Sequence, residues 1–171
     1  ICGTLAVSGY PIWVAWTAPI LVGIVVNSLV GIIVAYAGIP SIVVTLGMMS
    51  ILRGGLISVT GGDWITDMPE GFFLAQQDFM GIRVPLLALI FFTLLMFYIM
   101  SNTTWGRSLY AIGGNPEAAR TSGIDLKKGV VIAFAVHGMF VGLSTILFAT
   151  QLNIIQSTVP PNLELTVITA S

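Results

Sequence analysis

The sequence predicts an all-α, polytopic integral membrane helix bundle, and three observations lead to this fold class. Hydrophobic residues make up 56% of the 171 residues and charged residues only 8%, whereas a soluble domain has about 25% charged residues. Four apolar stretches are long enough to cross a bilayer, whose hydrocarbon core of ~30 Å takes about 20 helical residues. Small residues also recur at helical spacing within these stretches, which indicates that the spans pack on one another.

We predict four membrane spans, each with its own signals. They cover residues 12–37, 39–59, 85–101 and 129–150. The first has no charged residue, and the second carries Arg53. Pro85 suits the first turn of the third span, where a missing N–H costs nothing, and Asp125 can cap the fourth.

The connections around these spans predict a hairpin and an incomplete chain. Gly38-Ile39-Pro40 is a tight break that favours a hairpin between the first two spans over one kinked helix. Residues 1–7 have the character of the end of an earlier span, and residues from Leu163 onward that of the start of a later one. We therefore expect a fragment of a longer protein.

Lysine and arginine counts in the loops predict the orientation. The loop over residues 102–128 is basic, and we place it in the cytoplasm as a coupling loop; it carries Arg107, Arg120, Lys127 and Lys128. The loop over residues 60–84 has four acidic residues and one arginine, so we place it outside. Its aromatic residues predict a folded outer loop rather than a disordered linker.

Stripes of small residues predict how the spans pack. One stripe lies in each of three spans: Gly23, Asn27, Gly31 and Ala35 in the first, Gly47, Ser50 and Gly54 in the second, and Gly138 and Gly142 in the fourth. Each stripe lies on one helix face, where small side chains let a second helix approach closely. The stripes therefore predict a bundle rather than isolated anchors.

Three polar residues inside the spans are candidates for a translocation path: Asn27, Arg53 and His137. Each also has a structural interpretation. An arginine near mid-bilayer costs ~2.5–3.5 kcal/mol, so Arg53 either faces protein or a wet cavity, or reaches toward the outer interface. His137 either packs in the bundle or has a metal or proton-relay role. Asn27 either makes an interhelical hydrogen bond or contacts solute.

The cytoplasmic loop contains a short helix with signals at both ends. Asn115 is a suitable N-cap and Pro116 falls at the first helical position. Glu117 in the first turn and Arg120 toward the last complement the helix dipole, and Gly123 can close the helix in the left-handed conformation. A helix so defined between two spans suits docking to a soluble partner. We assign this docking role, which the resemblance described below makes one of ATPase coupling, to Asn115, Pro116, Glu117, Ala118, Ala119, Arg120, Ser122 and Gly123.

The sequence lacks the common motifs of metal-binding, redox and ATP-binding proteins, which limits the classes of function it can have. The chain has no CxxC, HExxH or GxxxxGK[ST], so we expect no metal site and no catalytic residue, with any ATP used by another polypeptide. The four predicted spans contain no Asp or Glu, which argues against an ion-coupled transporter. A permease driven by a separate ATPase fits best. The alternative is an ion-independent channel or a stand-alone secondary transporter for a small polar solute.

Two long motifs then resemble a known family, the bacterial sugar ABC importer permeases of the ribose/xylose type. The motifs run over residues 106–124 and 39–54. Gly61-Gly62-Asp63-Trp64-Ile65 resembles the outer loop of the rhamnose and autoinducer branch. The resemblance covers residues from about 12 to 171 and implies one partial transmembrane permease domain in the bacterial cytoplasmic (inner) membrane.

The resemblance also implies partners and a mechanism. Two permease subunits, identical or different, would form the pathway in membrane lipid, with two ATP-binding cassette subunits docked beneath. A periplasmic or lipid-anchored solute-binding protein would deliver the sugar or sugar-like solute from outside. No nucleic acid and no cofactor in this chain is expected. Residues 115–122 would sit in a groove of the ATPase, with Glu117 and Arg120 in polar contact and Ala118 and Ala119 allowing close approach.

Overall fold

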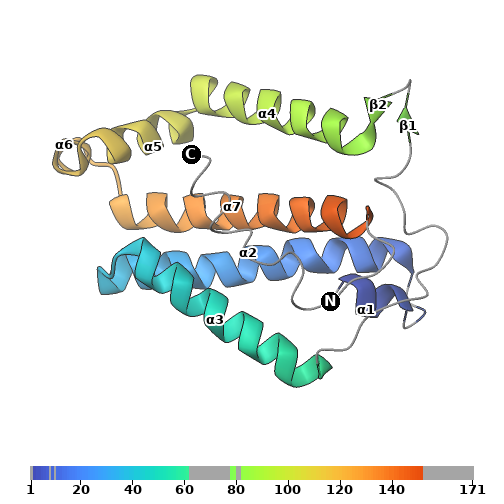
Figure 1. Cartoon of the computed structure of the whole chain (residues 1–171). Coiled ribbons are helices and arrows are strands. Elements are labelled where there is room, and N and C mark those ends of the chain that lie inside the picture. Colours follow the sequence, from blue (N-terminus) through green and yellow to red (C-terminus); the bar gives the residue numbers. More distant parts are fainter. Residues whose placement is uncertain (1, 8, 10, 62–77, 80–81, 152–171) are drawn as a thin grey trace.

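The computed structural model describes residues 2–7, 9, 11–61, 78–79 and 82–151, and it is helical apart from one short hairpin (Figure 1). Four helices are long and apolar enough to cross a membrane: α2 Ile12–Ala37, α3 Ser41–Thr60, α4 Val84–Asn102 and α7 Leu126–Ala149. The shorter elements are α1 Cys2–Val7, β1 Asp78–Phe79, β2 Ile82–Arg83, α5 Thr104–Gly114 and α6 Pro116–Thr121. The all-α bundle predicted from composition is therefore confirmed.

The antiparallel pair of α2 and α7 forms the centre of the described structure, with α3 beside α2 and α4 beyond α7 (Figure 1). Glycines make this central contact close. A Cβ built on Gly138 would meet the backbone of Gly23 and lie 2.8 Å from the Cβ of Asn27, and one built on Gly31 would lie 2.8 Å from the Cβ of Phe134. The small-residue stripes predicted in the first and fourth spans thus pack on each other.

The third stripe behaves differently. A Cβ built on Gly47 or Gly54 of α3 would meet no atom within 4 Å in the described structure, and no residue of α3 is buried there. Since α3 diverges from α2 after their shared turn (Figure 1), its small residues do not pack against the other described helices.

The turn between α2 and α3 forms as the hairpin prediction required. Gly38 ends α2 in the left-handed region with φ of 66°, where a side chain would be strained, and Pro40 with φ of −52° precedes α3. Residues 38–40 thus reverse the chain between α2 and α3. The ammonium nitrogen of Lys127 at the start of α7 lies 4.7 Å from the ring centroid of Tyr36, which joins this turn to the α5–α6 end.

Three features differ from the sequence-based expectation. The fourth long helix begins at Leu126 rather than residue 129, because the Asp125 carboxylate accepts from the Lys128 amide at 3.1 Å and caps it there. Phe79 and Ile82 pair in a two-residue antiparallel hairpin that was not predicted. The basic loop contains a second helix, α5. Most of the predicted outer loop, residues 62–77 and 80–81, lies outside the described residues.

Gly138→Ala is expected to destabilise the bundle, because its methyl group would enter the backbone of Gly23 at the α2–α7 contact. Overpacking of this kind costs ~1–3 kcal/mol. We expect a lower midpoint of thermal unfolding for the purified protein in detergent. Gly55→Ala is the matched control, because a Cβ there meets nothing within 4 Å among the described atoms. Equal midpoints for the two variants would contradict the contact.

Candidate functional site

The candidate site is the α5–α6 segment, residues 103–125, which projects from one end of the four long helices (Figure 1). It starts with a cap at Thr103, whose hydroxyl accepts from the Gly106 amide at 3.1 Å. A Cβ on Gly106 would meet the Met100 backbone, so this glycine allows α5 to fold back closely on the end of α4. At its other end, α5 lies on α7, where a Cβ on Gly129 would meet the Ile112 side chain.

Asn115 joins α5 directly to α6. Its amide donates to the Ala111 carbonyl at 3.0 Å and ends α5, while its side-chain oxygen accepts from the Ala118 amide at 3.1 Å and starts α6. Pro116 occupies the first turn, with Glu117 in the first turn and Arg120 in the last. The predicted N-terminal signals are therefore all in place, and no flexible linker separates the two helices.

The end of α6 forms a Schellman motif. The Ile124 amide donates to the Ala119 carbonyl and the Gly123 amide donates to the Arg120 carbonyl, both at 3.0 Å. Gly123 takes φ of 81°, which a residue with a side chain rarely adopts. The Ser122 hydroxyl and amide both donate to the Ala118 carbonyl, at 2.9 and 3.1 Å. The helix is thus closed by hydrogen bonds at both ends.

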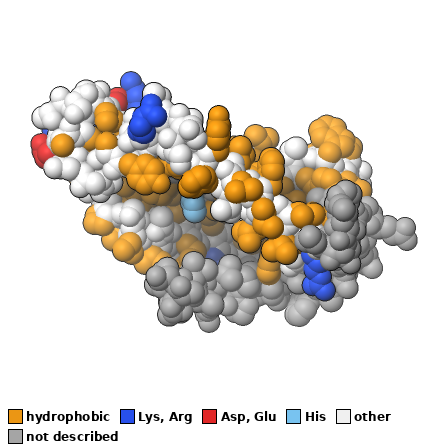
Figure 2. Space-filling model, turned by 90° about the horizontal axis from the view of Figure 1, so that it is seen from above, with side chains coloured by type: hydrophobic (Ala, Val, Ile, Leu, Met, Phe, Trp, Pro, Cys, Tyr) orange, Lys and Arg blue, Asp and Glu red, His pale blue; other side chains and the backbone are white. Residues whose placement is uncertain are grey.

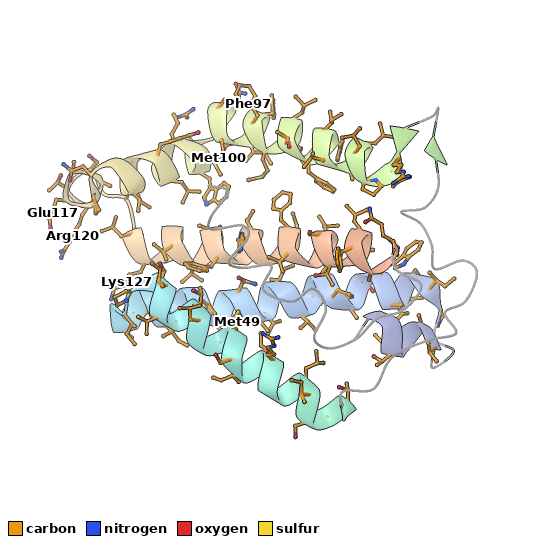
Figure 3. All side chains as sticks on the ribbon, viewed as in Figure 1. Met49, Phe97, Met100, Glu117, Arg120 and Lys127 are labelled. Carbon is orange, nitrogen blue, oxygen red and sulfur yellow. The ribbon has the colours of Figure 1, made fainter. Side chains whose placement is uncertain are left out.

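The exposed face of α6 differs from the predicted one at a single position. Glu117, Ala118 and Arg120 are exposed, and the two charged side chains extend from this end of the molecule (Figure 3). Ala119 is only 3% exposed. The expectation that Ala119 allows a partner to approach is therefore corrected, because its small size serves packing within its own chain.

The sequence also contains a signal for α5, a helix that was not predicted. Thr103 is a good N-cap residue, and Trp105, Leu109 and Ile112 follow at i, i+4 and i+7, which is one helix face. All three are at least partly buried, whereas Tyr110 on another face is 71% exposed. An amphipathic helix of this length fits the boundary between the bilayer and water.

The start of α7 lies beside the α5–α6 segment and is also capped. The Lys128 amide donates to the Asp125 carboxylate, and the Lys128 ammonium lies 3.2 Å from it. These two interactions with Lys128 lower the pKa of Asp125 below its usual range, the backbone hydrogen bond first. Asp125 therefore stays charged and keeps its capping role at neutral pH.

The three translocation-path candidates lie in two separate grooves. Asn27 and Arg53 line a shallow groove of about 360 Å³ between α2 and α3. The Asn27 amide donates to the Gly23 carbonyl of its own helix at 3.0 Å, so the interhelical bond expected for it is replaced by one within α2. His137 lines a larger groove between α4 and α7. The structure therefore does not bring the three residues together.

Charged side chains gather at the ends of the molecule, and hydrophobic side chains cover much of its middle on the face in Figure 2. This distribution suits helices that cross a membrane with the α5–α6 segment at one boundary. In the part of the chain that the structure describes, no group of three His, Cys, Asp or Glu residues could hold a metal ion.

The whole chain, residues 1–171, matches the family described as branched-chain amino acid transport system / permease component. The chain belongs to this family. It is 34% identical over 171 residues to the autoinducer 2 import system permease protein LsrC of Salmonella typhimurium, covering 99% of this chain and 49% of that protein. It is 33% identical to LsrC of Escherichia coli K12, in a match that covers 99% of this chain and 50% of that protein. This permease chain thus spans about half the length of the curated relatives it matches. No solved structure matches it.

Family membership and the four membrane-competent helices make this a multi-pass membrane protein. The resemblance stated from the two sequence motifs is confirmed by the similarity to LsrC along the whole chain.

Asn115→Ala is expected to loosen α6, because it removes the side-chain oxygen that accepts from the Ala118 amide. Loss of an N-cap costs about 1 kcal/mol, which corresponds to roughly fivefold faster local opening. Hydrogen exchange followed by mass spectrometry over residues 115–123 measures this. Asn115→Asp keeps an acceptor at the same place and should exchange like the wild type. Equal rates for the alanine and wild-type forms would mean that the cap does not hold the helix.

Proposed function

We propose that the chain is the transmembrane permease part of an ATP-driven importer that moves a sugar-like solute of the autoinducer class into the cell. ATP is hydrolysed on a separate ATP-binding subunit, and the protein lies in the bacterial cytoplasmic membrane. The observation that carries this proposal is α6, a two-turn helix closed at both ends that presents Glu117, Ala118 and Arg120 outside the bundle.

The α5–α6 segment is built to transmit a displacement. Asn115 links the two helices without spare residues. At one end α5 is held against the Met100 backbone of α4, and Ile112 lies over Gly129 of α7. A partner that pushes α6 therefore moves the ends of α4 and α7 together, because no loose connection absorbs the motion. Coupling by this route needs a rigid helix, which the capping hydrogen bonds provide.

The charges on α6 define the partner surface. Glu117 in the first turn, Arg120 in the last turn and the methyl group of Ala118 are all exposed on α6. A groove that receives this face needs complementary charges at its two walls and space for close backbone approach between them. The ATP-binding subunit of an importer is the partner we assign to this face.

Two observations support the class of solute that we propose: the side chains of the four long helices and the similarity to LsrC. The four long helices contain no Asp or Glu, so the described spans offer no carboxylate to hold the amino group of a branched-chain amino acid. LsrC is described as a permease of autoinducer 2 import, and the likeness to it runs over 99% of this chain. We therefore favour a neutral, hydroxyl-bearing solute over the amino acids in the family description. A second permease subunit and an external solute-binding protein complete the proposed assembly.

Ala118→Trp is expected to prevent docking of the ATP-binding subunit while leaving the permease folded. The side chain at position 118 is exposed, so a bulky indole is tolerated by the chain itself but blocks a partner. Co-purification of the ATP-binding subunit with full-length permease should fall at least tenfold, with an unchanged thermal midpoint.

Val59→Trp is the matched control, because Val59 is 87% exposed near the opposite end of the bundle. This variant should retain the subunit. Full retention by Ala118→Trp would remove the docking role from α6. If even the wild-type permease carries no ATP-binding subunit, the protein is instead a channel or a stand-alone transporter.

A further inference from the structure

The groove between α4 and α7 has a volume of about 920 Å³ in the described structure. It lies on the side of α7 turned away from α2. The two helices approach through the rings of Phe92 and Phe140, whose centroids are 5.7 Å apart at an interplanar angle of 87°. Such an edge-to-face contact spans the gap between helices without bringing their backbones together.

The side of α7 that lines this groove carries a polar stripe. His137, Ser144 and Gln151 all line it, and seven residues separate each from the next. Residues at this spacing drift by only about 20° per step around a helix, so the three share one face. Thr93 lines the same groove from α4. The opposite face of α7 packs on α2 through Gly138 and Gly142.

Three polar side chains that line the groove, those of Thr93, His137 and Ser144, are available for a ligand. Within the described structure the side chains of Thr93, His137 and Ser144 make no hydrogen bond. Thr145, the next residue along, differs because its hydroxyl donates to the Val141 carbonyl at 2.8 Å. Unsatisfied polar groups in a bilayer are costly unless they meet water or a polar partner. The stripe therefore indicates a wet or ligand-filled groove.

The groove extends along one half of α7. It runs from His137, near the middle of α7, to Gln151 just past its end, which is about 21 Å of helix. On the other wall it runs from Arg83 of β2 to Met96 of α4 and excludes the last turns of α4 before α5. Its mouth is thus at the end opposite α6, which the loop charges place outside the cell.

We propose that this groove is the outer half of the translocation path and takes a neutral polyhydroxylated solute about the size of one sugar ring. The proposal rests on the proposed function and identifies where its solute lies. Thr93, His137 and Ser144 exchange hydrogen bonds with hydroxyl groups, while Phe92 and Phe140 contact the apolar C–H faces. Ligand sites are commonly 300–1,000 Å³ and mostly apolar with a few polar groups, as this groove is.

Two other occupants fit the walls less well. A further helix that packs closely needs small residues opposite it, as at the α2–α7 contact, but these walls carry Phe92, Phe140 and Met96. A lipid chain gains nothing from His137 or Ser144 and leaves their polar atoms unpaired. The described lining also contains no carboxylate, so the groove does not select a cation.

Cysteine labelling tests the proposal in the full-length permease assembled with its ATP-binding subunit and binding protein in proteoliposomes. Native cysteines, Cys2 among them, are replaced by serine, and Ser144→Cys is compared with Thr145→Cys. The probe is a negatively charged, membrane-impermeant methanethiosulfonate added on the outer side. We expect Ser144→Cys to react at least tenfold faster than Thr145→Cys. Its modification should then reduce uptake at least fivefold, whereas treated Thr145→Cys retains uptake.

Thr93→Cys is the second test position, on the other wall, and keeps the proposal testable if Ser144→Cys fails to fold. It should show the same fast labelling. Reaction at positions 93 and 144 no faster than at 145 would overturn the proposal and indicate a helix or lipid in the groove. Labelling rates are also measured on full-length permease reconstituted alone, so that absence of an ATP-binding subunit would overturn the proposed function without changing the labelling pattern.

Discussion

The close contact between α2 and α7 is the constraint on which the other features depend. Between apolar helices in lipid there is no hydrophobic driving force, so association depends on close packing. Gly23, Gly31, Gly138 and Gly142 allow two backbones to meet where any side chain would collide. This contact determines which face of α7 packs on α2. The other face is consequently left to line the groove toward α4.

The face of α7 left open is the polar one. Gly138 contacts α2, whereas its neighbour His137 lines the groove on the other side of α7. Ser144 lines the same groove two turns later. At the start of α7, the cap at Asp125 and the ring of Tyr36 under Lys127 hold the helix end beside the hairpin turn. One helix therefore combines a packing face, a polar face and an anchored end next to α5 and α6.

The two ends of the molecule have different physical character, which suits directional transport. At one end, short helices are closed by hydrogen bonds and carry charges outward, as a rigid surface for a protein partner requires. Toward the other end, two long helices separate around polar and aromatic side chains. Under the proposed function, a motion applied to α6 is passed to both walls of the groove, since α5 contacts the end of α4 and the beginning of α7.

Much of this arrangement was readable from residues because the signals are local. The spans follow from apolar length, the hairpin from Gly38 and Pro40, and α6 from Asn115, Pro116 and Gly123, each acting within one or two turns. Helix α5 carried comparable signals in Thr103 and its apolar face. It was not predicted, because the glycines within it lower its helix propensity.

The sequence by itself determined the membrane-spanning helices, their turns and the caps of α6, because backbone hydrogen bonding and burial in lipid act locally. Only the tertiary structure decided which small-residue stripes pack against another helix. Gly47 and Gly138 occur in similar sequence patterns, but only Gly138 contacts a neighbouring helix in the described structure. It also decided that Ala119 faces its own chain, and that Asn27 and Arg53 lie apart from His137. Such distinctions depend on contacts between residues far apart in the chain, which no local pattern specifies.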